Sequence, residues 1–146
     1  MPTLSQFKSA LLKKFRPLPR SYFNTTDKVG IRRLAQLRVG LSDLRDHRNN
    51  HHFANCPTAM CACSQGPETT NHFLLECSRF ANQRHVLMSS LSRISPNIDL
   101  SDSPPLSNLL LYGSKDYSFY ANTDILNATV AFIKSSRRFD TLEAFS

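Results

Sequence analysis

The residues of this chain best suited to chemistry lie in one short stretch. All four cysteines fall between positions 56 and 77, and a histidine stands among them. Thiolates and imidazole nitrogens are the ligands that Zn²⁺ prefers, and four of them in a tetrahedral array close a structural site. The sequence therefore predicts structural zinc, and the preferred ligands follow the pattern C-x-C-x8-H-x4-C: Cys61, Cys63, His72 and Cys77.

The first pair of ligands has an alternative. Paired ligands in zinc sites are usually separated by about two to four residues, whereas only Ala62 lies between Cys61 and Cys63. Cys56 precedes Cys61 with four residues between them, so Cys56 remains an alternative ligand. Later in the stretch, His72 and Cys77 lie five positions apart. At about 100° per residue they point to different faces of a helix, so the turn must tighten or end before Cys77.

Two interpretations without a metal are also open. Disulfides need an oxidising compartment, but residues 1–20 lack the apolar run of a secretory signal peptide. Alternatively the thiols are free and buried, as free cysteines often are. His47, His51 and His52 are further candidate ligands, although a polar helix end leading into a loop is the simpler interpretation.

Positive charge is concentrated in the first third of the chain. The protein has 146 residues, enough for one domain, and a formal net charge of +7. Residues 1–50 contain eleven Lys or Arg against three Asp, a balance of +8, whereas residues 51–146 contain seven against eight acidic residues, a balance of −1. This asymmetry favours an anionic partner, and we expect nucleic acid, with a solvated basic face as the alternative. The expected phosphate contacts are Lys8, Lys13, Lys14, Arg16, Arg20, Arg32, Arg33 and Arg38.

Hydrophobic spacing predicts an all-α fold. The expected helices cover residues 4–15, 27–39, about 42–48, about 71 to the region of Cys77, 80–94, 106–112, and 123 or 124 to about 135. Asp27 is the expected N-cap of the second helix, and Gly40 is the expected left-handed residue that ends it. No apolar run approaches the ~20 residues of a membrane span, so a membrane is not an expected partner. A small-molecule substrate is not an expected partner either.

These helices are expected to form a single small domain. It would contain six or seven helices with an irregular zinc-knuckle loop at its centre. The parts are a basic helical segment at 1–50, the knuckle loop and ligand helix at 51–94, and a C-terminal helical segment at 95–146. Phe53 and Phe73 lie near the knuckle and could stack on bases, although Phe73 is followed by Leu74 and is expected in the core.

Several strings together resemble one family. They are Ile31-Arg-Arg-Leu-Ala-Gln-Leu-Arg-Val-Gly-Leu-Ser-Asp-Leu-Arg-Asp-His47, Cys61-Ala-Cys63, Glu68-Thr-Thr-Asn-His-Phe-Leu-Leu-Glu-Cys77, Leu109-Leu-Leu-Tyr-Gly113, Ala131-Phe-Ile-Lys-Ser135 and Arg138-Phe139. Together they resemble the segment downstream of the polymerase domain in non-long-terminal-repeat retrotransposon proteins, particularly the jockey-like animal elements. The resemblance extends from about Phe7 to Phe139.

The resemblance implies a role in holding nucleic acid. Those elements encode a reverse transcriptase, and the knuckle of its C-terminal segment has ligands that match Cys61, Cys63, His72 and Cys77, whereas Cys56 matches none. It also implies the polymerase part of the same element as a possible partner. Zinc ligation by free thiols implies a reducing compartment, and the resemblance implies the nucleus for part of the cycle, so the nucleus or the cytoplasm is expected.

Polymerase activity is not expected from this chain. Such enzymes gather carboxylates on metal ions, and the sequence contains no Asp-Asp pair. A non-enzymatic role is therefore predicted. The alternatives to nucleic-acid binding are a protein-interaction or scaffolding module, and a retrotransposon remnant without function.

Overall fold

The structure is a computed structural model that describes residues 28–52 and 55–140. Within these ranges the named elements are all helical, which confirms the predicted all-α class for this part of the chain. In order they are α2 (Lys28–Val39), α3 (Arg45–Asn50), the π-helical turn η2 (His72–Glu76), the 3-10 turn η3 (Ser78–Phe80), α4 (Ala81–Ile94), α5 (Ser103–Tyr112) and α6 (Phe119–Ser136). The predicted helix over residues 4–15 and the proposed cap Asp27 lie outside the described residues.

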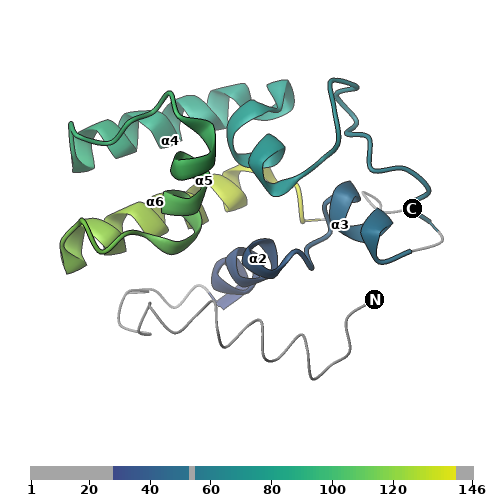
Figure 1. The fold of residues 1–146 in the computed structure, drawn as a ribbon, viewed down its shortest axis with the longest axis horizontal. Coiled ribbons are helices and arrows are strands. Elements are labelled where there is room, and N and C mark those ends of the chain that lie inside the picture. The colour runs from purple at the N-terminus through teal and green to yellow at the C-terminus, as the bar shows by residue number, and fades with distance from the viewer. Residues whose placement is uncertain (1–27, 53–54, 141–146) are drawn as a thin grey trace.

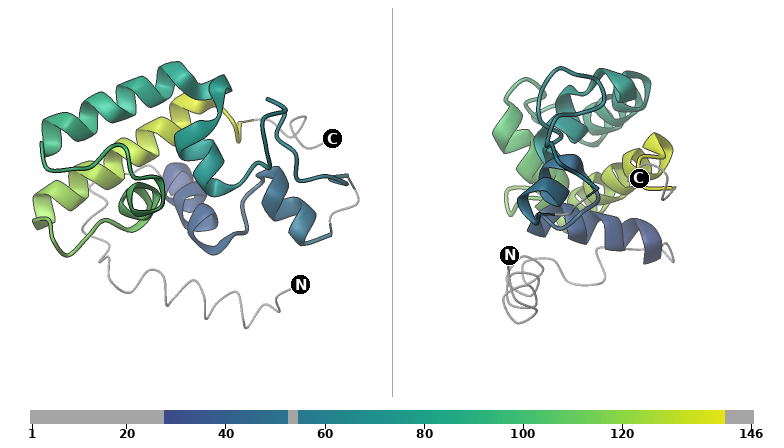
Figure 2. Two further views of the ribbon diagram at one scale, coloured as in Figure 1. Left: turned by 45° about the horizontal axis from the view of Figure 1, so that its top comes forward. Right: turned by 90° about the vertical axis from the view of Figure 1, so that its right-hand side faces the viewer.

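Helix α6 is the element on which most of the others pack. Its 18 residues extend about 27 Å at 1.5 Å per residue, and it contacts α4, α2 and α5. Figure 1 shows α4 running alongside α6, with α2 on the other side. The further views in Figure 2 place α3 and the loop that follows it at one end of this helical body.

An aromatic cluster joins the Cys/His region to α6. Phe73, in η2, is completely buried. Its ring centroid lies 5.3 Å from those of Phe80 and Phe132 and 5.5 Å from that of Phe139. The expectation that Phe73 belongs to the core is confirmed, and the turn that should carry metal ligands is therefore anchored to the hydrophobic interior. Phe53 lies outside the described residues.

Helix α2 ends as predicted but buries one arginine that was expected to face solvent. Gly40 has φ 71°, and the N–H of Leu41 donates to the carbonyl of Gln36 at 3.0 Å, as in a glycine-terminated helix. Arg38 is only 4% exposed. Its guanidinium donates to the carbonyl of Leu111 and lies 5.4 Å from the ring centroid of Tyr112. The last carbonyls of a helix lack intrahelical donors, and the Arg38 guanidinium donates to one of these carbonyls in α5.

Two helices begin earlier than the sequence predicted. Helix α5 begins at Ser103 with prolines in its first turn, where their missing N–H groups cost nothing; Pro105 was expected to close the preceding loop. Helix α6 begins at Phe119, because the Ser118 hydroxyl accepts the N–H of Ala121 at 3.1 Å and caps the helix. The predicted start at Thr123 or Asp124, with a loop through residue 122, is wrong.

Asn122 explains why the turn before α6 is so tightly defined. Its side chain is buried, accepts the Ser114 N–H at 2.9 Å and donates to the Ser114 carbonyl at 2.8 Å. Gly113 has φ 69° and ψ −167°, a conformation that is almost confined to glycine. A Cβ at Gly113 would lie 2.6 Å from Oδ1 of Asn122. The turn thus needs glycine for two separate reasons.

We expect the Gly113→Ala variant to lose about 2–4 kcal/mol of unfolding free energy, through backbone strain and the clash together. Gly40→Ala has the strain alone, since nothing lies within 4 Å of its Cβ, and should lose about 1–2 kcal/mol. Gly66→Ala, also in open space, should lose less than about 0.5 kcal/mol. Urea denaturation followed by circular dichroism measures all three; equal losses at positions 113 and 40 would remove the clash from the explanation.

Candidate metal centre

Cys61 and Cys63 lie in a tight reversal of the chain. Met60 and Pro67 form an isolated antiparallel bridge around it. Inside the bridge, the Cys61 N–H donates to the Gly66 carbonyl at 2.8 Å, and the Ser64 N–H donates to the Cys61 carbonyl at 2.9 Å. The backbone of Ser64 is left-handed, with φ 65°. Because the chain turns back on itself here, two cysteines separated by one residue can both reach a common point.

His72 and Cys77 come from the ends of the π-helical turn η2. The Cys77 N–H donates to the His72 carbonyl at 2.7 Å, an i→i+5 bond that inserts one more residue than an α-helical turn contains. Helical geometry stops at Glu76, and Cys77 has extended dihedrals of φ −62° and ψ 124°. The sequence predicted that the turn would tighten or end before Cys77. It ends there, but it is widened instead of tightened.

The four predicted ligands converge. The Sγ atoms of Cys61 and Cys77 are 3.7 Å apart, Sγ of Cys63 lies 3.3 Å from Nε2 of His72, and all four ligand atoms lie within 4.8 Å of one another. A tetrahedral ion with zinc-like bond lengths would separate two sulfurs by about 3.8 Å and a sulfur from a nitrogen by about 3.5 Å. The donor set and its spacing fit a metal ion.

Cys56 does not belong to this cluster. Its thiol is buried and donates to the carbonyls of Thr58, at 3.3 Å, and Arg45, at 3.5 Å. It is absent from the group of ligand atoms found among the described residues. All four cysteines are free thiols. Cys56 therefore closes the loop onto the start of α3, and the alternative in which it replaces a ligand has no geometric support.

Other histidines have structural partners of their own. His47, at 7% exposure, accepts the Ser42 N–H at Nδ1 over 3.2 Å, and its Nε2 lies 3.2 Å from Oγ1 of Thr70. Burial lowers the pKa of His47, which favours the neutral ring. His51 lies 3.2 Å from the Gly40 carbonyl through Nε2. These rings join α2, α3 and the knuckle, and neither is part of the metal cluster.

A carboxylate lies near the second ring nitrogen of His72. Its Nε2 faces the cluster, while Nδ1 lies 3.6 Å from Oε2 of Glu76. Oε1 of Glu76 accepts from the side-chain amide of Asn71 at 2.7 Å, and Oδ1 of Asn71 accepts from the Ser103 hydroxyl at 3.1 Å. Metal-binding histidines commonly present their second nitrogen to a carboxylate in this way. The chain of contacts links the cluster to the start of α5.

Arg79 touches two of the ligand sulfurs. Its Nε donates to Sγ of Cys77 at 3.4 Å, and one terminal nitrogen donates to Sγ of Cys61 at 3.1 Å. Burial raises the pKa of Cys61. For Cys77 burial acts in the same direction, but the hydrogen bonds from Arg79 and Cys61 outweigh it and lower the pKa. The Cys77 thiol is therefore the easier of the pair to deprotonate for metal binding.

The buried carboxylate of Glu68 holds Arg79 in place. Glu68 is 1% exposed and accepts from Arg79 at 2.7 Å. The guanidinium of Arg138, which follows α6, donates to both of its oxygens at 2.6 and 2.7 Å. The Arg45 N–H, at the start of α3, donates at 2.8 Å. Sequence reasoning missed the roles of Glu68, Arg79 and Arg138. The one available signal was that Glu68 and Arg79 lie close to His72 and Cys77 in the sequence, and Arg138 had no such signal.

The basic residues proposed to contact phosphates do not form one described surface. Arg32 is exposed, and Arg33 is half-buried and donates to Asp43 at 3.1 Å and to the Phe139 carbonyl at 3.2 Å. The placement of Arg38 on a solvent-facing surface was wrong, because that side chain is buried against α5. The remaining five lie outside the described residues: Lys8, Lys13, Lys14, Arg16 and Arg20.

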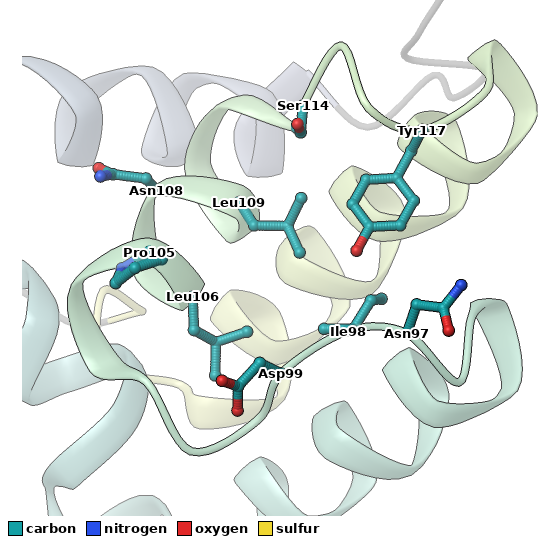
Figure 3. Close-up of a pocket in the computed structure, with 10 residues that line it drawn as sticks. Asn97, Ile98, Asp99, Pro105, Leu106, Asn108, Leu109, Ser114 and Tyr117 are labelled. Atoms are coloured by element: carbon teal, nitrogen blue, oxygen red, sulfur yellow. The ribbon is translucent and has the colours of Figure 1, made fainter.

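A separate cavity of about 440 Å³ opens between the loops that precede and follow α5. Figure 3 shows Leu109, Ile98 and Tyr117 facing this space, while Asn108 points away from it. Among the residues that line it, Asp99 is the one carboxylate, and no histidine or cysteine is present. The cavity lacks a converging set of donors, so the Cys/His cluster is the candidate functional site.

Comparison with known proteins gives no match: no family model, no curated protein and no solved structure matches this chain. Among the described residues, no helix has both the length and the apolar character needed to cross a membrane.

Replacing Glu68 by glutamine should strongly destabilise the fold. The variant leaves the buried guanidinium of Arg138 without its carboxylate, and breaking a buried ion pair costs about 3–5 kcal/mol. Chemical denaturation measures the change. Asp116→Asn is the matched control, because Asp116 is exposed and its loss should cost less than about 0.5 kcal/mol. Similar small losses in both variants would show that the pair contributes little.

The same carboxylate should make stability depend on acid pH. Burial opposes ionisation of Glu68, but the bonds from Arg138, Arg45 and Arg79 lower its pKa below the ordinary value of 4.5. The stabilisation is thus complete above the unfolded-state pKa and is lost as the pH falls through the lower folded-state pKa. Glu68→Gln should remove this part of the pH dependence, as denaturation at a series of acid pH values would measure.

Proposed function

We propose that this protein is a zinc-stabilised helical module that binds RNA or DNA and has no polymerase activity of its own. We further propose that it corresponds to the post-polymerase segment of a jockey-like retrotransposon reverse transcriptase. The observation that carries the proposal is the convergence of three thiols and an imidazole within 4.8 Å. Those groups come from the same two strings that support the resemblance, around Cys61 and Glu68–Cys77.

Zinc is the metal that this donor set suits best. Soft thiolates with an imidazole in a tetrahedral arrangement favour Zn²⁺ over the harder oxygen-binding cations. Four protein ligands leave no position for a reacting water, so the ion would be structural. Its binding energy would add directly to the folding energy of a loop that is otherwise poor in apolar contacts. Thiol ligation also implies a reducing compartment, and the proposed family implies the nucleus or the cytoplasm.

Nucleic-acid binding rests on the charge of residues 1–50, which is +8. Arg33 and Arg38 donate to Asp43, Phe139 and Leu111 within the fold, so phosphate contacts would be made by Arg32 and by the basic residues of positions 8–20. Such contacts supply affinity without reading sequence, and they weaken as salt rises.

One observation favours the alternative of a protein-interaction or scaffolding module. Some of the basic side chains make contacts within the fold, since Arg38 is buried and Arg33 is bound to Asp43. A module of this kind would pack on the polymerase part of the same element or on a host protein. Its remaining basic residues would then face an acidic protein surface and not phosphates.

Metal removal tests the zinc half of the proposal. The purified chain should contain about one zinc ion per molecule by elemental analysis, and a strong chelator should remove it together with part of the helical circular dichroism signal. A zinc-free chain that keeps its helices would contradict the proposal.

Matched cysteine variants test which thiols bind the ion. Cys61→Ser and Cys77→Ser each remove a ligand and should lose most of the metal. Cys56→Ser is the control, since that thiol bonds to backbone carbonyls outside the cluster, and it should retain zinc. Equal loss in the Cys56 variant would move the first ligand pair upstream.

Salt titration tests the nucleic-acid half. Converting Lys8, Lys13, Lys14, Arg16 and Arg20 to glutamine should flatten the plot of log affinity against log salt, by about 0.7–0.9 for each phosphate that the variant no longer neutralises. Lys115→Gln with Arg93→Gln removes two exposed charges from outside residues 1–50 and is the control. Single-stranded RNA and duplex DNA serve as probes. Absence of binding to both would favour the interaction module.

A further inference from the structure

A cluster of three thiolates around a divalent ion carries an unbalanced charge. Cys61, Cys63 and Cys77 would contribute three negative charges as ligands, the ion two positive charges, and neutral His72 none, so the centre would have a net charge of −1. Cys61 is almost fully buried, at 1% exposure, and Cys77 is completely buried. Cys63 is half-buried. Water therefore has little access to the sulfurs of Cys61 and Cys77, and a buried charge needs a partner.

Arg79 is placed to supply that partner. Among the described residues it is the cationic side chain that donates to two of the ligand sulfurs, at 3.1 and 3.4 Å. Its guanidinium is held from two further directions, by Glu68 at 2.7 Å and by the Phe80 ring, whose centroid is 4.8 Å away. A planar guanidinium with fixed donor directions suits this position better than a flexible ammonium would.

A nearby arginine that is less exposed than Arg79 provides a comparison. Arg84 donates to the carbonyls of Leu74, Phe73 and Cys77 at 2.9, 3.1 and 2.8 Å. Those carbonyls belong to η2 and the residue that follows it, so Arg84 satisfies the end of the π-helical turn. All three of these bonds go to the backbone and none to a ligand sulfur. Arg84 supports the backbone of the site, whereas Arg79 contacts the atoms that would bind the ion.

We propose that Arg79 is the charge-compensating partner of the metal centre, acting through the sulfur atoms of Cys61 and Cys77 and held in place by Glu68. This inference rests on the proposed zinc site. Hydrogen bonds from Arg79 withdraw electron density from the two thiolates and balance the charge of the loaded cluster. Glu68 in turn balances the excess positive charge of Arg79 and Arg138, so that charges alternate from the metal to the end of α6.

The test uses the full chain loaded with Co²⁺, a tetrahedral substitute for zinc whose absorption reports the thiolates directly. In Arg79→Met the sulfur-to-cobalt charge-transfer band should move to lower energy, because thiolates without hydrogen-bond donors give up electrons more easily. Zinc affinity, measured by competition with a chromophoric chelator, should fall about 10–100-fold. Arg79→Lys, which keeps the charge, should recover part of both effects.

Arg84→Met is the matched control. Affinity alone cannot separate the two roles, since metal binding is coupled to folding and any destabilising variant weakens it. The energy of the charge-transfer band can separate the two roles. In Arg84→Met the band should stay at the wild-type position. An unshifted band in Arg79→Met, or equal shifts in both variants, would overturn the proposal while leaving the zinc site intact. A wild-type chain that binds neither Co²⁺ nor Zn²⁺ would instead overturn the proposed function.

Discussion

A carboxylate removed from water must be surrounded by hydrogen-bond donors. The donors that surround the Glu68 carboxylate come from separate segments of the chain, and their hydrogen bonds hold these segments together. Transfer of such a group to the interior costs several kcal/mol unless geometry and hydrogen bonds compensate. Arg138 approaches it with a two-bond fork, Arg79 with one bond and the backbone of Arg45 with another. These donors belong to the residues that follow α6, to η3 and to the start of α3. One buried charge therefore joins three separate segments of the chain.

The π-helical turn η2 contributes both to the Cys/His cluster and to the hydrophobic core. Its i→i+5 bond directs His72 and Cys77 toward the cluster, while Phe73 and Leu74 between them are completely buried in the core. An α-helical turn would place residues five apart on faces separated by roughly 140° at about 100° per residue, and one of the two ligands would then compete with the core for the same side of the helix. The widened turn and the extended backbone of Cys77 resolve that conflict locally. Single π turns of this type often occur at functional sites.

Features that depend on neighbouring residues could be predicted from the sequence, and features that depend on distant partners could not. The cluster of three cysteines and His72 could be predicted from residue type, although the spacing of the first pair left Cys56 as an alternative. Gly40 could be predicted from its place after an apolar stripe. Arg38 was misplaced because its acceptor, the Leu111 carbonyl, lies 73 positions away. Glu68 and Arg138 are 70 positions apart, so neither predicts the other. The start of α6 was missed because Ser118 and Thr123 are both acceptable caps, and only the buried contacts of Asn122 favour the earlier one.

The position of Phe73 means that metal binding and core packing are not independent. Its ring contacts Phe80, Phe132 and Phe139, and its backbone lies between His72 and Cys77. A change in the cluster that alters this turn must move the ring, and interiors packed as densely as organic crystals transmit such a shift to their neighbours. Phe132 and Phe139 then carry it to the C-terminal end of α6, and Arg138 ties the residues that follow this end to Glu68. The proposed ion would therefore stabilise the helical body through the aromatic cluster as well as through the loop that holds it.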